Sequence, residues 1–221
     1  MTTRSSLLPR RPKGRGDTRK SLIDGAFKLM DGNKSFDGLS QRELTREVGI
    51  VPTAFYRHFP GMAELGQALV DDAFRGLRQI ITDVRTDVLE NRGKVSAVAK
   101  SLVKHVRAQR ERFRFIASER FGGSAPIRDA IRRELRLVQS ELAIELARFP
   151  ALKDWPAEDL HMASALIVNA MVAAIEELLD RGTGDKAATS DLQRMAERQL
   201  RLIVLGMAGW KPVPAGSRPR S

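Results

Sequence analysis

Apolar residues recur along this chain at intervals of three and four, the spacing that places side chains on one face of an α-helix. No run alternates apolar and polar residues as a half-buried strand does, and aromatic residues are only 5% of the chain. The pattern predicts about nine helices, at residues 17–31, 40–49, 52–59, 62–88, 94–109, 111–120, 126–149, 157–180 and 187–208. We therefore expect an all-α fold.

Local signals mark the ends of the first helices. Asp17 is a good N-cap, and Ser40 followed three residues later by Glu43 forms a capping box. Gly49 supplies the backbone freedom that a tight turn needs, and Pro52 suits a first helical position. Two short helices around a tight turn, followed by a long one, are typical of a helix-turn-helix that contacts DNA.

The segment 52–59 has two faces, because successive helical residues turn by roughly 100°. Phe55 and Phe59 share the face expected to pack inward, and Arg57 lies opposite, where a guanidinium can donate two hydrogen bonds to a guanine edge. The small Ala54 permits close approach to a base. Phosphate contacts are expected from a wider set that includes helix starts: Arg15, Arg19, Ser40, Arg42, Thr53, Tyr56 and His58. The alternatives are a packed Tyr56, a helix-capping His58 and a solvated Arg57.

Charge supports a nucleic-acid partner. The formal net charge is +11, and residues 1–16 contain five basic side chains and no acid. We divide the chain into a basic disordered arm at 1–16, a helix-turn-helix DNA-binding domain at 17–61, a helical ligand-binding and dimerisation domain at 62–210, and a flexible tail at 211–221.

No pattern indicates catalysis. The chain has no cysteine, and its three histidines (58, 105 and 161) are too scattered for a metal pair at helical spacing. Gly182–Lys186 lacks the glycine spacing of a phosphate loop. We expect no enzyme activity, no metal and no cofactor. The absence of cysteine fits a reducing cytoplasm, and we find neither a signal-peptide core nor an apolar run of membrane-spanning length.

The residues Val48-Gly49-Ile50, Phe55-Tyr56-Arg57-His58-Phe59 and Glu64-Leu65 resemble the TetR family of bacterial transcription regulators. That resemblance implies an all-helical ligand-binding body and a homodimer built on the last two helices, which binds a palindromic operator. Residues 50–59, together with 113–116, 119–120 and 123–124, are similar to the FabR and DesT type, which controls unsaturated fatty-acid synthesis and senses acyl-CoA or acyl carrier thioesters.

This narrower resemblance implies a tunnel between helices for an acyl chain. We expect it to be lined by Phe74, Leu77, Leu102, Val106, Phe113, Phe121, Leu142 and Met171, although each can equally be plain core. Arg120 and the basic run Arg107, Arg110, Arg112 and Arg114 are candidates for the phosphates of the head group, or form a solvated face.

The dimer interface is expected on apolar and small residues of the last two helices, namely Ile167, Ala170, Ala174, Leu178, Leu200, Ile203 and Met207. Asn169 interrupts an apolar run, so it either sets the register of this interface or points into the pocket.

The favoured hypothesis is a dimeric repressor of fatty-acid metabolism in which a long-chain acyl-CoA tilts the long fourth helix and changes the separation of the two DNA-contacting helices. One alternative is a TetR-type repressor that senses another hydrophobic small molecule or drug and controls an efflux or catabolic operon. Two further alternatives are a basic protein that coats DNA without sequence preference and a helical enzyme.

Overall fold

The structure is a computed structural model, and it describes residues 15–31, 34–87, 94–181 and 186–211. The described residues form the helices α1 (Arg15–Met30), η1 (Phe36–Gly38, a 3₁₀ turn), α2 (Gln41–Val48), α3 (Pro52–Phe55), α4 (Met62–Asp87), α5 (Lys94–Ala108), α6 (Arg110–Gly122), α7 (Ala125–Leu146), α8 (Ala157–Arg181) and α9 (Lys186–Gly209). They contain no strand, which confirms the predicted all-α fold.

Several predicted boundaries were wrong; the seventh helix, for example, ends at Leu146 and not at Phe149. The first helix begins at Arg15, two residues before the expected N-cap Asp17. The third helix ends at Phe55 instead of Phe59, because the chain continues as a turn in which the N–H groups of His58 and Phe59 both donate to the Phe55 carbonyl, at 2.9 and 3.0 Å. This turn still brings Phe59 back to the core beside Phe55, so the predicted inward face is confirmed.

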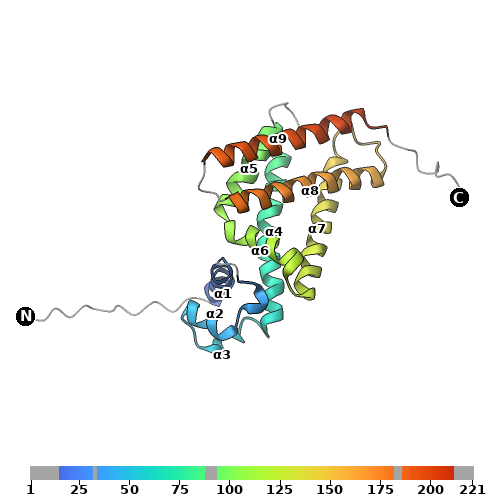
Figure 1. Cartoon of the computed structure of the whole chain (residues 1–221). Helices are drawn as coiled ribbons and strands as arrows, with labels where there is room; N and C mark the ends of the chain where they lie inside the picture. Colours follow the sequence, from blue (N-terminus) through green and yellow to red (C-terminus); the bar gives the residue numbers. More distant parts are fainter. Residues whose placement is uncertain (1–14, 32–33, 88–93, 182–185, 212–221) are drawn as a thin grey trace, which may run out of the picture.

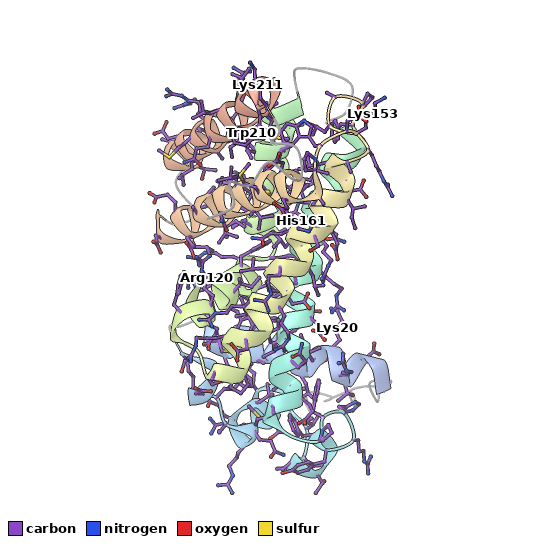
Figure 2. The ribbon with its side chains drawn as sticks, turned by 90° about the vertical axis from the view of Figure 1, so that its right-hand side faces the viewer. Lys20, Arg120, Lys153, His161, Trp210 and Lys211 are labelled. Atoms are coloured by element: carbon purple, nitrogen blue, oxygen red, sulfur yellow. The ribbon has the colours of Figure 1, made fainter. Side chains whose placement is uncertain are left out.

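The helices are arranged around α4, which runs along the molecule (Figure 1). Helices α1, α2 and α3 gather at one end, and α8 and α9 lie across the other. In the side view of Figure 2, Lys20 lies near the first end, and Trp210 and Lys211 lie near the second. Trp210 donates its indole N–H to Asp159 at 3.2 Å, which ties the end of α9 to the start of α8.

One continuous core passes through both ends of the molecule. It includes the residues of α1 that the apolar pattern placed inward, Leu22, Ile23, Ala26, Phe27 and Met30. Phe27 meets Phe115 of α6 edge to face, with ring centroids 5.6 Å apart. The helices near the amino terminus are therefore packed directly onto the body.

Helix α8 is apolar around most of its circumference. We expected no apolar run of membrane-spanning length, but by length and composition the segment Ala157–Asp180 is suited to crossing a membrane; 44% of its most apolar stretch is buried inside the protein. Core helices of soluble proteins pass the same test. Helices α5, α6, α7 and α9 all pack against α8, and together they cover the buried part.

Candidate DNA interface and effector cavity

The predicted capping box at the start of α2 is confirmed. The Ser40 hydroxyl accepts the Glu43 backbone N–H at 3.2 Å. Lys34 pairs with the Glu43 carboxylate, and this bond lowers the pKa of Glu43. The Ser40 backbone N–H also helps to lower the pKa of the Glu43 carboxyl. At the other end, Gly49 adopts a left-handed conformation with φ of 75°, which reverses the chain into α3.

The turn leaves a row of polar side chains in solvent. Thr53, Tyr56 and Arg57 are exposed, whereas Ala54 and His58 are half-buried. On the neighbouring elements Arg19, Ser40 and Arg42 are exposed as well; the side chain of Arg15 lies outside the described residues. The surface formed by these side chains is called the α2–α3 face below. Its predicted contacts with DNA remain predictions.

Tyr56 is held in place on the α2–α3 face. Its hydroxyl donates to Gln41 Oε1 at 3.0 Å, and Gln41 Nε2 donates to the Pro52 carbonyl at 3.2 Å. The sequence analysis did not identify Gln41 as the residue that holds Tyr56. Its position directly after the N-cap Ser40, on the first turn of α2, could have indicated that it lies near the turn. Tyr56 is 59% exposed, so it is not the packed aromatic that we considered as the alternative.

The cations of the α2–α3 face differ in their surroundings. The Arg19 guanidinium lies over the Phe59 ring, 5.0 Å from its centroid. By contrast, the side chains of Arg42 and Arg57 form no ion pair within the part of the chain that the structure describes. A guanidinium without an acidic partner keeps all its donors available for phosphate or base edges.

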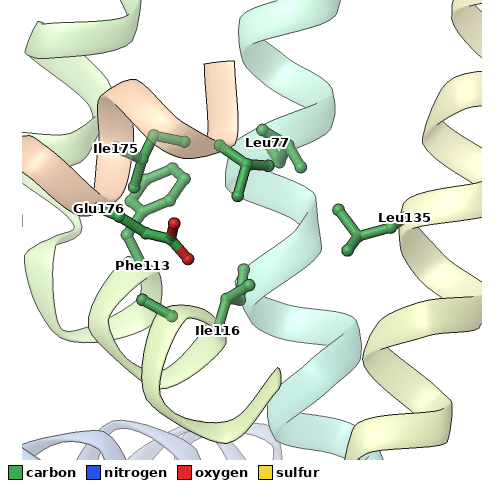
Figure 3. Close-up of a pocket in the computed structure, with 8 residues that line it drawn as sticks. Leu77, Phe113, Ile116, Leu135, Ile175 and Glu176 are labelled. Carbon is green, nitrogen blue, oxygen red and sulfur yellow. The ribbon is translucent and has the colours of Figure 1, made fainter. Parts of the chain in front are cut away.

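A small cavity lies between four helices of the body (Figure 3). Its walls are Leu77 from α4, Phe113, Ile116 and Ala117 from α6, Leu135 from α7, and Val172, Ile175 and Glu176 from α8. Its volume is about 10 Å³, which is room for about one water molecule. Of the predicted tunnel residues, only Leu77 and Phe113 line this cavity.

The other predicted tunnel residues lie elsewhere. Phe74, Leu102, Val106, Leu142 and Met171 are buried in the common core and are not among the residues that line the cavity. Phe121 is 71% exposed, so its prediction as a pocket residue was wrong. It sits on the last turn of α6, where its ring stacks on the Arg120 guanidinium with 4.3 Å between cation and ring centroid.

Arg120 is the cationic neighbour of the cavity. Its guanidinium pairs with Glu176 at 3.2 Å, and Glu176 is the one carboxylate among the residues that line the cavity. Arg120 therefore lies next to a residue that lines the cavity, but its ion pair is with Glu176 of the protein. Its predicted contact with a ligand head group remains a prediction.

Most of the predicted basic run Arg107, Arg110, Arg112 and Arg114 makes contacts within the protein. Arg112 binds Asp24 of α1 at 2.6 Å and Asp72 of α4 at 2.7 Å, and Arg114 binds the Asp31 carboxylate at 2.9 Å. Arg107 donates to Thr189 of α9 at 2.9 Å. Arg110 differs, because its Nε is buried without a hydrogen-bond partner in the described part of the chain. The head-group role of this run remains a prediction.

Helices α8 and α9 present an apolar surface, but not the predicted one. Leu178 and Leu200 are buried in the protomer, so their assignment to a dimer interface was wrong; Ile167, Ala170, Ala174, Ile203 and Met207 are half-buried. The α8–α9 face is the name used below for exposed residues of these two packed helices, namely Met162, Leu166, Asn169 and Ala173 on α8, and Met195, Leu202 and Leu205 on α9. Asn169 therefore points away from the cavity.

Comparisons with known proteins agree with this geometry. Residues 22–69 match the family described as "Bacterial regulatory proteins, tetR family". A TetR-family transcriptional regulator from Streptomyces coelicolor has 18% identity and a TM-score of 0.60, over 90% of this chain and 85% of that one. The fatty acid degradation regulator FadR from Bacillus halodurans has 14% identity and a TM-score of 0.65, over 89% and 98% of the two chains.

A transcriptional regulator FadR from Bacillus subtilis, solved in complex with stearoyl-CoA, has 13% identity and a TM-score of 0.65, over 85% of this chain and 98% of that one. At these identities the solved structures show a shared fold. The family match lies on the helix-turn-helix that the α2–α3 face is built from. The match places a tetR-type helix-turn-helix in residues 22–69, and the chain as a whole shares the all-helical fold of the solved TetR-family regulators.

Proposed function

We propose that this regulator is a homodimeric repressor of a palindromic operator and that a long-chain acyl thioester modulates its affinity for DNA. The observation that supports DNA recognition is the α2–α3 face. There Arg42 and Arg57 extend into solvent without acidic partners among the described residues, while Phe55 and Phe59 anchor the same segment in the core. In this proposal Arg57 contacts a guanine, Ala54 lets the segment approach the bases closely, and the polar side chains of the face contact phosphates.

The cavity supports an apolar effector. Seven of the eight lining residues are hydrophobic. Small-molecule sites occupy roughly 300–1,000 Å³, so the present volume of about 10 Å³ belongs to a closed state. An effector that binds only when α4, α6, α7 and α8 separate would shift the protein towards an open state. If the open and closed states differ in their affinity for DNA, effector binding changes that affinity.

The test is selection of binding sites from random duplex DNA with the purified protein, with and without oleoyl-CoA. We expect one palindrome to be enriched and its affinity to change when oleoyl-CoA is added. A palindrome that is indifferent to oleoyl-CoA would remove the acyl-thioester part of the proposal. Binding without sequence preference, lost steeply as salt rises, would instead indicate a DNA-coating protein.

Glu176 favours a second candidate, a repressor that senses a different hydrophobic molecule and controls an efflux or catabolic operon. A carboxylate in an apolar wall suits a ligand with a basic group, since such a ligand can replace Arg120 as its partner. Titration of the DNA complex with a lipophilic quaternary ammonium compound separates the candidates. If the cation releases the protein from DNA, and if Glu176→Gln no longer responds to the cation, the second candidate is supported over the acyl thioester.

A further inference from the structure

Helix α3 is too short to be stable through its own hydrogen bonds. It spans only Pro52–Phe55, a single turn. Forming the first turn of a helix fixes several backbone angles for one hydrogen bond, which is unfavourable in isolation. Its N-cap residue is Val51, whose apolar side chain cannot cap the helix. The arrangement of α3 therefore depends on its contacts with the rest of the protein.

Apolar packing fixes α3 at one side only. Phe55 is the buried residue of the helix, and Phe59 joins it in the core directly after the following turn. The two rings contact each other, with centroids 5.7 Å apart. Pro52 and Thr53 are exposed. Because apolar attraction has no preferred direction, these contacts hold α3 against the core without setting its orientation.

Gln41 supplies directional contacts at both ends of α3. It is the first residue of α2, and its Nε2 donates at 3.2 Å to the carbonyl of Pro52, the residue at which α3 begins. Its Oε1 accepts the hydroxyl of Tyr56, the C-cap of α3, at 3.0 Å. The Tyr56 ring in turn meets the Phe55 ring edge to face, with centroids 5.7 Å apart. One side-chain amide therefore joins α2 to the start and to the end of α3.

Helix α2 is itself held firmly. The Ser40 hydroxyl caps its first turn, directly before Gln41. Leu44 is fully buried, and Glu47 pairs with Lys28 of α1 at 2.6 Å. Gln41 therefore joins a single-turn helix to an element whose own position is fixed.

We propose that Gln41 is a positioning residue that keeps α3 formed and oriented against α2 before DNA arrives. The inference rests on the proposed function in one respect, that α3 contacts DNA. If a segment becomes ordered only during binding, the free energy of ordering it lowers the affinity. Gln41 thus contributes to operator affinity through α3, and no contact between Gln41 and DNA is needed.

The first test is backbone amide hydrogen exchange of the full-length protein without DNA, measured by NMR. The α3 reporters are the Ala54 and His58 amides, which close the turns at the start and just after the end of the helix, each at 2.9 Å. We expect both to exchange about tenfold faster in Gln41→Ala, because two hydrogen bonds are lost. The Leu44 amide, inside α2, should keep its wild-type exchange rate.

Gln67→Ala is the matched control. The Gln67 side chain also donates a hydrogen bond, to Asp71 at 2.8 Å, but both residues belong to α4, so this bond joins no two helices. The α3 reporters should be unchanged in this variant. Wild-type exchange of the reporters in Gln41→Ala would overturn the proposal. An equal acceleration of the Leu44 amide would do the same, because α2 itself would then have loosened.

The second test is affinity for the selected palindrome. Tyr56→Phe keeps the ring and removes the hydroxyl that Gln41 holds. We expect Gln41→Ala to weaken binding roughly five- to tenfold. The factor should be smaller when Tyr56→Phe is already present, because both changes remove the same bond. Equal factors in the two backgrounds would contradict positioning through Tyr56.

Two further results would overturn the proposal. Weaker DNA binding of Gln41→Ala with wild-type exchange in α3 would make Gln41 a direct DNA contact. Stronger binding would mean that Gln41 competes with DNA for the Tyr56 hydroxyl, which has a single proton to donate. Failure of the proposed function is distinct: if no palindrome is enriched, DNA recognition fails, while the exchange rates still decide whether Gln41 positions α3.

Discussion

At the residue scale, Glu119 links stability to pH. Burial raises the pKa of its carboxyl above the ordinary value of 4.5; the Phe36 N–H opposes this shift and the negative charge of Asp37 adds to it. Because the folded pKa lies above the unfolded one, the contribution of Glu119 to stability is fully present below the unfolded pKa. It is lost as pH rises through the folded pKa.

Glu119→Gln should therefore stabilise the protein near pH 7, since it removes a buried charge and keeps an acceptor for Phe36. We expect a gain on the order of 1 kcal/mol, measured by urea unfolding at a series of pH values. The difference from wild type should disappear towards pH 4. A difference that is the same at every pH would mean that Glu119 is not the titrating group.

Alanine substitutions of Arg57 and Arg42 test whether the first contacts a base and the second a phosphate. Arg57→Ala should relax the sequence preference at one base pair by roughly 1–3 kcal/mol. Arg42→Ala should weaken binding to all sequences alike, and it should lower the slope of log affinity against log salt concentration by about one. Both are measured by titrating the selected operator and its single-base variants at several salt concentrations. A uniform loss in Arg57→Ala would reassign Arg57 to a phosphate.

At the element scale, the end of α6 depends on one glycine. The Gly123 N–H closes the helix on the Glu119 carbonyl at 3.1 Å. A Cβ at Gly123 would lie 2.7 Å from that carbonyl oxygen and would also meet the Glu119 carboxylate, whereas a Cβ at Gly122 would meet nothing within 4 Å. A side chain therefore fits at Gly122 and clashes at Gly123.

We expect Gly123→Ala to destabilise the protein by about 1–3 kcal/mol, because neither the backbone oxygen nor the buried carboxylate can move freely. Gly122→Ala is the matched control and should be neutral or stabilising by up to about 1 kcal/mol, since alanine favours a helix. Thermal unfolding of the two variants gives the comparison. Equal stability of both would show that the end of α6 rearranges at little cost.

At the scale of the whole molecule, the α8–α9 face is the candidate interface for the proposed homodimer. Leu202→Glu places a charge on this face, where the side chain is 72% exposed in the protomer. We expect the dimer to weaken by at least tenfold in sedimentation velocity experiments. Operator affinity should fall with it, because only a dimer spans two half-sites.

Leu137→Glu on α7, at a side chain that is 50% exposed, is the control for this prediction and should leave the dimer intact. If Leu137→Glu dissociates the protein and Leu202→Glu does not, the interface lies on α7. If neither variant does, the α8–α9 face is not required for dimerisation.

Much of this protein follows from its sequence by itself. The capping box at Ser40, the reversal at Gly49 and the inward pair Phe55 and Phe59 were predicted from local spacing. Such features depend on residues within one or two turns of each other, so the identity of the neighbours decides them. The same holds for the all-α composition, since the period of the apolar pattern is a local property.

Only the tertiary structure decided how apolar and charged side chains are used. Leu178 and Leu166 are equally apolar, yet one is buried and the other exposed, because the helix that carries both has apolar residues on most of its circumference. Arg112 and Glu119 looked like ordinary helix-surface charges until α6 placed them against Asp24 and Phe36, more than 80 residues away in sequence. A long-range contact depends on how whole helices pack, and no local pattern encodes that arrangement.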